Sequence, residues 1–552
     1  MALKSKFASR LALTMLSSAL LLSSGCGSAF PSGVEAFPKT GSAYVNPDTR
    51  LILSFKSGMP AQGDGKACIG KKGKIRIFDA ATGDIVDSID LGIPAGPTEK
   101  RDYATDIDYA KIPYDYSRSS MPTNRDTKPG TPSGTAEPTP PDYQLNIIGG
   151  FTDAFHFRPV ILHGDSAVIY LHNNMLDYGH RYYVTIDGGV LNFPGSGFEG
   201  IKSKRAWNFR TKKTAPARHD SEGGIDTLAV NANGSGDFST LQGALDFIPD
   251  FTPGRTVILV AEGDYEELIY TRNKQNVTII GAGMEKTRFH YPNNEVFNPH
   301  PLTVKNNERP GTFPYRRAAF ALDNCRDITL KDMTIATDLK GQAEGLLING
   351  ERIALYRVHI IGDGDALQAN GTIYMESCEL DGGWDAFLGR GSLFAYRCAL
   401  RNQGGPFSWV RNTEGIHGDV FVECSFEAFR SEADTGKSGE SLPQGIGTSC
   451  YPSAPATFGR TGKVAEKYPF SEFVVIDCSL KGISPAGWEP DEPRASTSIM
   501  YEFNSRDLDT DRPVDVSRRR PGVRQLALPR DSALIQAYRS PDYILKGWNP
   551  DE

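Results

Sequence analysis

The chain has 552 residues, of which 39% are hydrophobic and 23% are charged, and its mean hydropathy is −0.37. This composition excludes a wholly disordered chain and supplies apolar material for more than one core. The 57 Gly and 36 Pro make up about one residue in six, more than is usual, which favours β-rich architecture over helix bundles. The formal net charge of −7 is opposite in sign to that of most nucleic-acid-binding domains, so we expect no nucleic-acid partner.

The N-terminus has the layout of a secretory signal. Three basic residues precede the apolar run Leu11–Leu22, which is too short to span a bilayer. The next four residues, Ser23-Ser24-Gly25-Cys26, resemble the bacterial lipobox, whose cysteine is lipidated and becomes the new N-terminus. We therefore expect residues 1–25 to be a lipoprotein signal peptide and Cys26 to anchor the protein to a membrane. No aspartate follows Cys26, which favours an outer-membrane location, on the periplasmic or cell-surface face; export with ordinary cleavage is the alternative.

Residues 35–212 have the alternation of an all-β domain. Apolar and polar residues alternate in Lys74–Phe78 and in Tyr182–Ile186, and turn signals such as Thr82-Gly83-Asp84 separate such runs. This pattern predicts a β-sandwich, and the region resembles the bacterial immunoglobulin-like domains that precede secreted enzymes. Thr, Lys, Pro, Ala and Gly gather in residues 213–225, which we interpret as a linker.

From residue 226 to residue 549, short apolar strands recur without long helical periods. Runs of a few residues, such as Val277–Ile280, Ile373–Met375 and Phe473–Ile476, belong to a series that returns roughly every 20 to 25 residues. This spacing predicts a right-handed parallel β-helix, a solenoid of stacked coils. One helical segment, Leu241–Phe247, precedes the coils and is predicted to cap their N-terminal end.

Four of the eight cysteines stand in the same local frame. Each begins an alternating run that points the cysteine and the residue two positions later to one face; the four are Cys378, Cys398, Cys424 and Cys478. Their spacings of 20, 26 and 54 residues predict one cysteine per coil, with two coils in the last gap. We interpret them as free thiols stacked in the core. Export would also allow disulfides, whereas no Cys-x-x-Cys or histidine pattern indicates a metal cluster.

Asp365 and Asp385 are the main candidates for chemistry. They lie 20 residues apart, so a solenoid of that period would place them on adjacent coils, about 5 Å apart. Two carboxylates this close repel each other, so one tends to stay protonated and can act as an acid while the other is an ionised nucleophile. On spacing alone, ordinary surface aspartates in turns are the alternative.

An ordered set of motifs surrounds this pair. It includes Asn233–Gln242, Gly263–Glu267, Gln342–Leu346, Phe458-Gly459-Arg460 and Pro485–Trp488. The set resembles the pectin methylesterases over about residues 226 to 549; each motif alone is weak, and the ordered set is strong. The resemblance implies a parallel β-helix enzyme without a metal or other cofactor. It also implies methyl-esterified polygalacturonate, or its oligomers, as the partner.

The resemblance assigns roles to individual residues. Asp385 looks like the nucleophile that attacks the C6 ester carbonyl, and Asp365 like the acid that protonates departing methanol and then the base that activates water. Gln342 resembles a side-chain donor to the oxyanion, and Arg460 resembles the guanidinium that keeps Asp385 ionised and oriented. The structural alternatives are a ladder residue of the solenoid for Gln342 and a surface arginine for Arg460.

The sequence also departs from the family's pattern. The glutamine expected before the acid/base aspartate is Gly364, so one of two oxyanion donors is missing, and Gln368 is the candidate replacement. The phenylalanine expected after the nucleophile is Ala386, with Phe387 one place later, and Thr461-Gly462 stand where Pro-Trp is expected. These differences are compatible with an altered pectin pattern, with another uronate ester or with loss of activity.

Aromatic side chains supply candidate sugar contacts. Tyr265, Trp384 and Trp409 can stack on sugar rings, and Phe387 and Gln368 complete the predicted substrate-binding set; buried packing is the alternative for any one aromatic residue.

Taken together, the motifs and the signal predict a monomeric, lipid-anchored carboxylic ester hydrolase. A hydrolase of another ester or thioester and a non-catalytic glycan-binding β-helix protein are the rival functions. A polysaccharide lyase is disfavoured, because the sequence shows no carboxylate cluster of the kind that binds calcium. The sandwich is expected to space the catalytic solenoid from the membrane, with glycan binding as the alternative.

Overall fold

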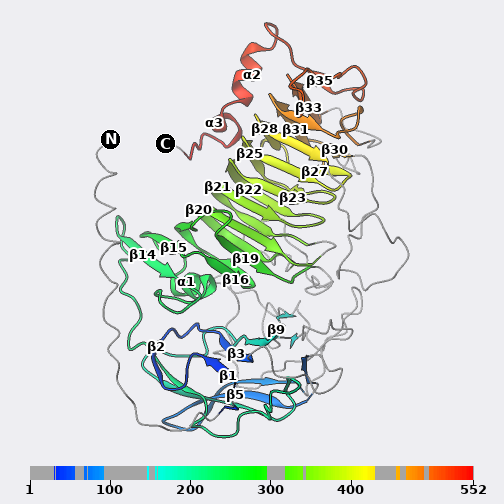
Figure 1. Cartoon of the computed structure of the whole chain (residues 1–552). Helices are drawn as coiled ribbons and strands as arrows, with labels where there is room; N and C mark the ends of the chain where they lie inside the picture. Colours follow the sequence, from blue (N-terminus) through cyan, green and yellow to red (C-terminus); the bar gives the residue numbers. More distant parts are fainter. Residues whose placement is uncertain are drawn as a thin grey trace.

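The computed structural model describes residues 30–31, 33–55, 67–70, 72–91, 146–147, 156–157, 159–294, 317–339, 343–428, 456–460, 468–489 and 497–550. They form a β-sandwich followed by a long β-helix, with the sandwich at the N-terminal end of the helix (Figure 1). None of the helices in these ranges has the length and hydropathy that a membrane span requires. The predicted signal peptide and Cys26 lie outside the described residues, so the lipid anchor stays a prediction.

Two sheets form the sandwich. The first has the order β1 (Val34–Phe37), β3 (Leu51–Phe55), β10 (Ser166–Ile169) and β9 (Val160–His163). The second has the order β2 (Ser42–Val45), β13 (Asn208–Thr211), β11 (Arg181–Ile186), β5 (Lys74–Asp79) and β6 (Ile85–Asp90). Two short pairs join β4 (Cys68–Ile69) with β12 (Leu191–Asn192) and β7 (Asn146–Ile147) with β8 (His156–Phe157). Alternate residues of both sheets, among them Leu51, Ile75 and Val184, share one buried core, as expected for a sandwich.

The β-helix confirms the predicted solenoid. Its strand pairings are parallel, and each coil stacks on the preceding one; β22, for example, pairs with both β24 and β25 of the next coil. Inward-facing apolar residues of successive coils form one continuous core. The 22 strands of this sheet are β14 (Ile225–Val230), β15 (Arg255–Val260), β16 (Gly263–Glu266), β17 (Ile269–Arg272), β18 (Gln275–Ile280), β19 (Thr287–Tyr291), β20 (Phe320–Thr337), β21 (Leu346–Ile361), β22 (Leu367–Glu376), β23 (Glu379–Gly382), β24 (Phe387–Gly389), β25 (Ser392–Tyr396), β26 (Ala399–Asn402), β27 (Pro406–Val410), β28 (Asp419–Val422), β29 (Ser425–Ala428), β30 (Thr457–Arg460), β31 (Glu472–Ile476), β32 (Ser479–Lys481), β33 (Ile499–Phe503), β34 (Arg506–Asp507) and β35 (Arg524–Gln525).

One helix covers the N-terminal end of the solenoid, and two others lie on the outer face of its C-terminal coils. The predicted helix is confirmed as α1 (Leu241–Phe247), and its N-cap Thr240 accepts a hydrogen bond from the backbone N–H of Gly243. The helix buries Leu241 and Leu245 in the core of the β-helix. Two further helices, α2 (Ser532–Tyr538) and α3 (Pro541–Ile544), were not expected from the sequence. They pack Ile535, Tyr538 and Ile544 on the outer face of the C-terminal coils.

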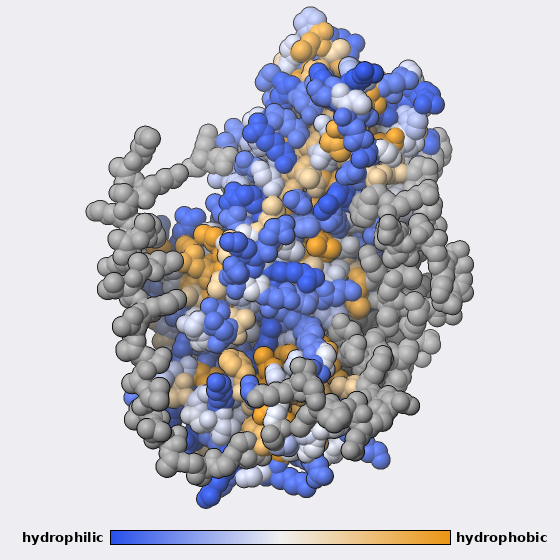
Figure 2. Space-filling view, in the orientation of Figure 1, coloured by the Kyte–Doolittle hydropathy of each residue, from blue (hydrophilic) through white to orange (hydrophobic). Residues whose placement is uncertain are grey.

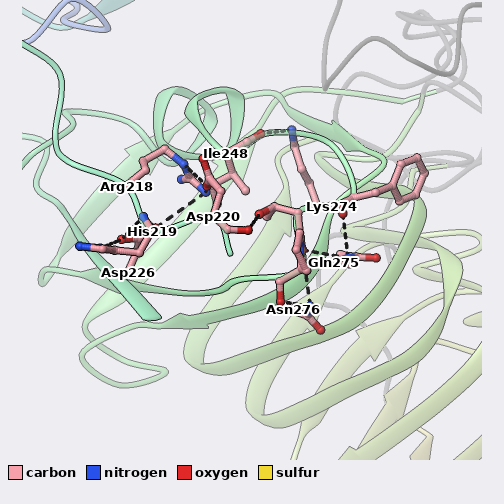
Figure 3. A network of polar contacts seen from close by, with 11 residues as sticks. Arg218, His219, Asp220, Asp226, Ile248, Lys274, Gln275 and Asn276 are labelled. Atoms are coloured by element: carbon pink, nitrogen blue, oxygen red, sulfur yellow. Dashed lines mark hydrogen bonds and ion pairs between the residues drawn. The ribbon is translucent and has the colours of Figure 1, made fainter. Parts of the chain in front are cut away.

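The segment interpreted as a linker is bonded to the first coils (Figure 3). The Nδ1 atom of His219 lies 2.8 Å from the Asp226 carboxylate, and Arg218 pairs with Asp220 at 2.5 Å. Next to this contact, the buried Lys274 donates to Asp250 at 2.9 Å, and Gln275 holds two backbone carbonyls of the loop after α1 at 2.8 Å. The chain therefore enters the β-helix through a bonded segment rather than a free tether.

The sandwich is also bonded directly to the cap of the β-helix. Asp48 of the sandwich accepts hydrogen bonds from the backbone N–H groups of Ser239 and Thr240 at 2.9 and 2.8 Å. Glu267 of the β-helix accepts hydrogen bonds from the first two N–H groups of α1 and pairs with Arg50 of the sandwich at 3.4 Å. One carboxylate from each domain thus accepts hydrogen bonds at the N-terminal end of α1. The N–H groups in the first turn of a helix have no partner within the helix, so negatively charged acceptors stabilise this end.

The face of the molecule in Figure 2 is mainly polar. The large apolar side chains that the structure places in solvent include Tyr44 on the sandwich and Ile225 and Leu259 on the first two strands of the β-helix. Isolated exposed apolar residues of this kind are normal on a protein surface.

The four cysteines stack on successive coils as free thiols. Glu379 pairs with Ala399, and Ala399 with Ser425, so the cysteines just before them lie above one another, and all four are buried. The expectation of two coils in the last gap is wrong, because Ser425 pairs directly with Ser479. The 54-residue spacing is therefore one coil with a long insertion.

We expect the buried thiols to react with a thiol reagent only after unfolding. A thiolate is the reactive form, and burial raises the pKa of Cys325 to about 12. In the double variant Cys26→Ser, Cys450→Ser, which removes the two cysteines outside the described residues, the native protein should consume one equivalent of reagent at the exposed Cys68 and five more in denaturant. More than one fast-reacting equivalent in the native protein would contradict the burial of the five thiols. Fewer than six reactive thiols in total after denaturation would indicate a disulfide.

Candidate active site

Asp365 and Asp385 lie one above the other at a corner of the β-helix. Leu367 of β22 pairs with Phe387 of β24, so the residues two positions earlier are aligned as well, and the backbone N–H of Asp365 donates to the carbonyl of Trp384 at 3.0 Å. Both aspartates have a positive φ, 61° and 52°, a conformation that Asp tolerates better than most residues. The structure therefore places the two carboxylates on adjacent coils, as their 20-residue spacing predicts.

A third carboxylate extends this stack. Leu346 of β21 pairs with Leu367, which aligns Glu344 with Asp365 on the preceding coil. Arg317 bridges the two carboxylates: its Nε donates to Glu344 at 2.5 Å and its Nη2 donates to Asp365 at 2.7 Å. All three side chains are buried. We call Glu344, Asp365 and Asp385 the carboxylate ladder.

Arg460 holds the opposite end of the carboxylate ladder. Its Nε donates to Oδ1 of Asp385 at 3.0 Å, and its Nη2 donates to Oδ2 of the same carboxylate. The guanidinium also lies 4.0 Å from the ring centre of Trp409, its register partner on the neighbouring strand. This two-point contact fixes the orientation of the Asp385 carboxylate, and the stacking on Trp409 fixes the guanidinium.

Burial and mutual repulsion govern the protonation of the carboxylate ladder. The pKa of Asp385 is raised to about 7, mainly by burial; Arg460 opposes this rise and Asp365 contributes to it. Burial also raises the pKa of Glu344 to about 8, against the opposing effect of Arg317 and with a further increase from Asp365. Three stacked carboxylates in a buried volume are not all ionised together. The ladder can therefore present an ionised carboxylate beside a protonated one, which is the pair that nucleophilic attack with acid assistance requires.

A cationic and aromatic border lies next to the carboxylate ladder. The guanidinium of Arg411 is 4.5 Å from the ring centre of Trp409, and Tyr468 meets Trp409 edge to face at 6.3 Å. Arg390 donates to the Tyr468 hydroxyl at 2.9 Å. These groups combine positive charge with ring faces, which suits an acidic sugar.

Two of the predicted sugar contacts are core residues. Tyr265 is fully buried; its hydroxyl donates to a backbone carbonyl at 3.0 Å and its ring packs on Phe289. Phe387 is buried against Phe421. Their rings are inaccessible to a ligand, and packing is their observed role. Trp384 and Trp409 are half-buried, so part of each residue stays exposed.

Of the two predicted oxyanion donors, the structure describes Gln368 but not Gln342. Gln342 lies outside the described residues, as do Thr461 and Gly462. Gln368 is buried, and its amide oxygen has no hydrogen-bond partner among the described residues. It pairs with Leu388, which in turn pairs with Trp409, so Gln368 stands on the strand face that carries Trp409 and Arg460.

Several residues of this site were not identified from the sequence: Arg317, Glu344, Arg390, Arg411 and Tyr468. A signal existed for Glu344, which precedes Asp365 by 21 residues, nearly the same period that separates the two aspartates. No periodic signal marks the arginines, because they stand outside the strand register that aligns the three carboxylates.

Part of the chain is similar to known pectinesterases. Residues 227–409 match the model of the pectinesterase family; the match runs from β14 to β27 and includes Asp365 and Asp385. The probable pectinesterase 8 of Arabidopsis thaliana is 23% identical over 316 residues, which cover 56% of this chain and 73% of that protein. A pectinesterase of Daucus carota is 24% identical over 281 residues, with 50% and 80% covered.

Among solved structures, pectin methylesterase from carrot superposes with a TM-score of 0.43 and 19% identity, covering 60% of this chain and 95% of that one. The pectin methylesterase PemA from Erwinia chrysanthemi gives a TM-score of 0.40 and 15% identity, with 60% and 98% covered.

Proposed function

Because the chain belongs, through residues 227–409, to the pectinesterase family of carboxylic ester hydrolases, we propose that it hydrolyses the C6 methyl esters of galacturonate in pectin. The products are pectate and methanol. The observation that carries the proposal is the buried pair Asp365 and Asp385 on adjacent coils, with Arg460 bound at two points to Asp385.

In the proposed reaction, the ionised Asp385 attacks the ester carbonyl carbon, and the carbonyl electron pair moves to the oxygen. When this tetrahedral intermediate collapses, the C–O bond to methoxide breaks and the leaving oxygen takes the proton of Asp365. The product of this step is an anhydride between Asp385 and the galacturonate carboxyl, together with methanol. Asp365, now ionised, removes a proton from water, and the hydroxide opens the anhydride to restore both aspartates.

Arg460 and Gln368 have supporting roles in this reaction. Arg460 opposes the rise in the pKa of Asp385 that burial causes and so keeps part of the nucleophile ionised near neutral pH. Gln368, on the same strand face, is the proposed donor to the oxyanion. Trp384 and Trp409 are the proposed stacking surfaces for sugar rings, and Arg411 beside Trp409 adds a positive charge that fits a polyanionic substrate.

The test of this function is methanol release from highly methylated pectin. We expect methanol and titratable acid to appear in equal amounts, with none from unmethylated polygalacturonate. A folded protein that releases no methanol would overturn the pectin assignment. Because Gly364 replaces an expected donor, an acyl thioester assayed in parallel tests the second candidate function, hydrolysis of another ester or thioester; turnover of that compound alone would favour it.

A further inference from the structure

Glu344 has no part in the two-aspartate reaction, yet it contacts the same arginine as the acid/base Asp365. Its side chain is fully buried, and Oε1 accepts a hydrogen bond from Arg317. The other oxygen, Oε2, is buried and has no hydrogen-bond partner among the described residues. An ionised carboxylate with one unsolvated oxygen is costly, whereas a protonated carboxyl carries less charge to solvate. The environment of Glu344 therefore favours a bound proton.

Resting on the proposed function, we propose that Glu344 is a positioning residue of the reaction: joined to Asp365 through Arg317, it shares with Asp365 the proton that leaves with methanol. The two carboxylates and the guanidinium form a buried cluster that is electrically neutral when it holds one proton. Buried clusters favour neutrality, because an uncompensated charge is costly away from water. In this cluster Asp365 can therefore carry a proton even though a guanidinium lies 2.7 Å away.

The same cluster also serves the second half of the reaction. Once the proton has left with methanol, Glu344 and Asp365 are both ionised and share one positive charge. Their repulsion strengthens the attraction of Asp365 for a proton, which it then takes from the attacking water. The proton thus returns to the cluster, which ends the reaction cycle with the same number of bound protons as at the start.

Among the residues that the structure describes, Arg317 and Asp365 are the charged groups that act on Glu344. On the far side of Asp365 lie Asp385, which is paired with Arg460, and Arg411. These groups lie beyond the cluster of Glu344, Arg317 and Asp365, whose one bound proton supplies the acid.

The test begins with the pH profile of kcat/KM for Glu344→Gln, using the complete protein and methylated pectin. Glutamine keeps the size of the side chain and an acceptor for Arg317, but it removes the charge. Without the negative charge of Glu344, the pair of Asp365 and Arg317 is neutral when Asp365 is ionised. Asp365 therefore loses its proton, and with it its function as the acid, at a lower pH. We expect the alkaline limb of the profile to move to lower pH by about one unit, which is roughly a tenfold loss of activity at a fixed pH on that limb.

Arg317→Gln provides the opposite change. Without the guanidinium, the two carboxylates hold their proton more tightly, so the alkaline limb should move to higher pH. A merely structural role would not produce shifts of opposite sign in the two variants. Glu379→Gln is the matched control, since Glu379 lies 3.6 Å from Arg401 in a half-exposed pair elsewhere on the β-helix; its profile should match that of the parent protein. Superimposed alkaline limbs for Glu344→Gln and the parent, or shifts in the same direction for the two cluster variants, would overturn the proposal.

Infrared spectroscopy separates this proposal from the proposed function. A protonated carboxyl has a C=O stretch that a carboxylate lacks, so the difference spectrum between the parent and Glu344→Gln near neutral pH should show the loss of one protonated carboxyl. This readout does not require turnover of pectin. Parent protein that is inactive on pectin but shows the infrared difference would refute the esterase assignment and keep the shared proton. Active protein without the infrared difference would do the reverse.

Discussion

Asp385→Asn is expected to lower kcat for methanol release by about 10⁴-fold or more, which is the scale on which enzymes lose rate when the nucleophile is removed. An amide is a poor nucleophile and does not form the anhydride with the galacturonate carboxyl. Asparagine keeps the shape of the side chain and one oxygen acceptor for Arg460, so the fold should persist. The measurement is methanol release under saturating pectin, accompanied by thermal unfolding of each protein.

The chain offers a matched control for this substitution. Asp381 precedes Asp385 in the sequence by a few residues. Its carboxylate also accepts two hydrogen bonds from one arginine, Arg401, at 2.5 and 2.8 Å. Asp381→Asn removes an equivalent charge and an equivalent ion pair away from the carboxylate ladder. We expect it to keep the activity of the parent protein. Comparable activity in Asp385→Asn and Asp381→Asn would exclude Asp385 as the nucleophile.

The solenoid makes an unusual amount of this site predictable from the sequence. In a β-helix, two residues that lie one coil apart in the sequence are neighbours on adjacent strands. The interval between Asp365 and Asp385 was therefore enough to predict that they lie next to each other. The same conversion explains the stacked cysteines. It fails where a coil carries an insertion, because the interval between Cys424 and Cys478 is equally consistent with two short coils or with one coil and a long loop.

Positions that depend on strand parity or on long side chains were harder to predict. A shift of one residue along a strand moves a side chain to the opposite face, which is why Phe387 could be assigned to the substrate and yet lies in the core. Arg316 and Arg317 are adjacent in the sequence, and nothing in their composition says which of them reaches the ladder. The partners of a flexible, charged side chain are decided by tertiary packing, so the Arg317 bridge emerged only from the structure.

Arg460→Gln is expected to lower kcat/KM by about 10² to 10³ at neutral pH, and to do so with a characteristic pH dependence. Arg460 lowers the pKa of Asp385 and so opposes the effect of burial, and with Arg460 in place this pKa is about 7. Without the guanidinium this pKa rises further, and the nucleophile must be ionised to attack. The acid limb of the profile should therefore move to higher pH, and the deficit relative to the parent protein should shrink as the pH increases.

Two companion variants make this prediction sharp. Arg460→Lys keeps a positive charge but loses the two parallel N–H donors, so we expect a smaller shift of the acid limb together with a lower kcat from the poorly oriented carboxylate. Arg401→Gln breaks the equivalent pair at Asp381 and should leave the limb in place. An acid limb that stays fixed in Arg460→Gln would mean that Arg460 does not control the ionisation of the nucleophile, and that its contact with Asp385 acts on orientation alone.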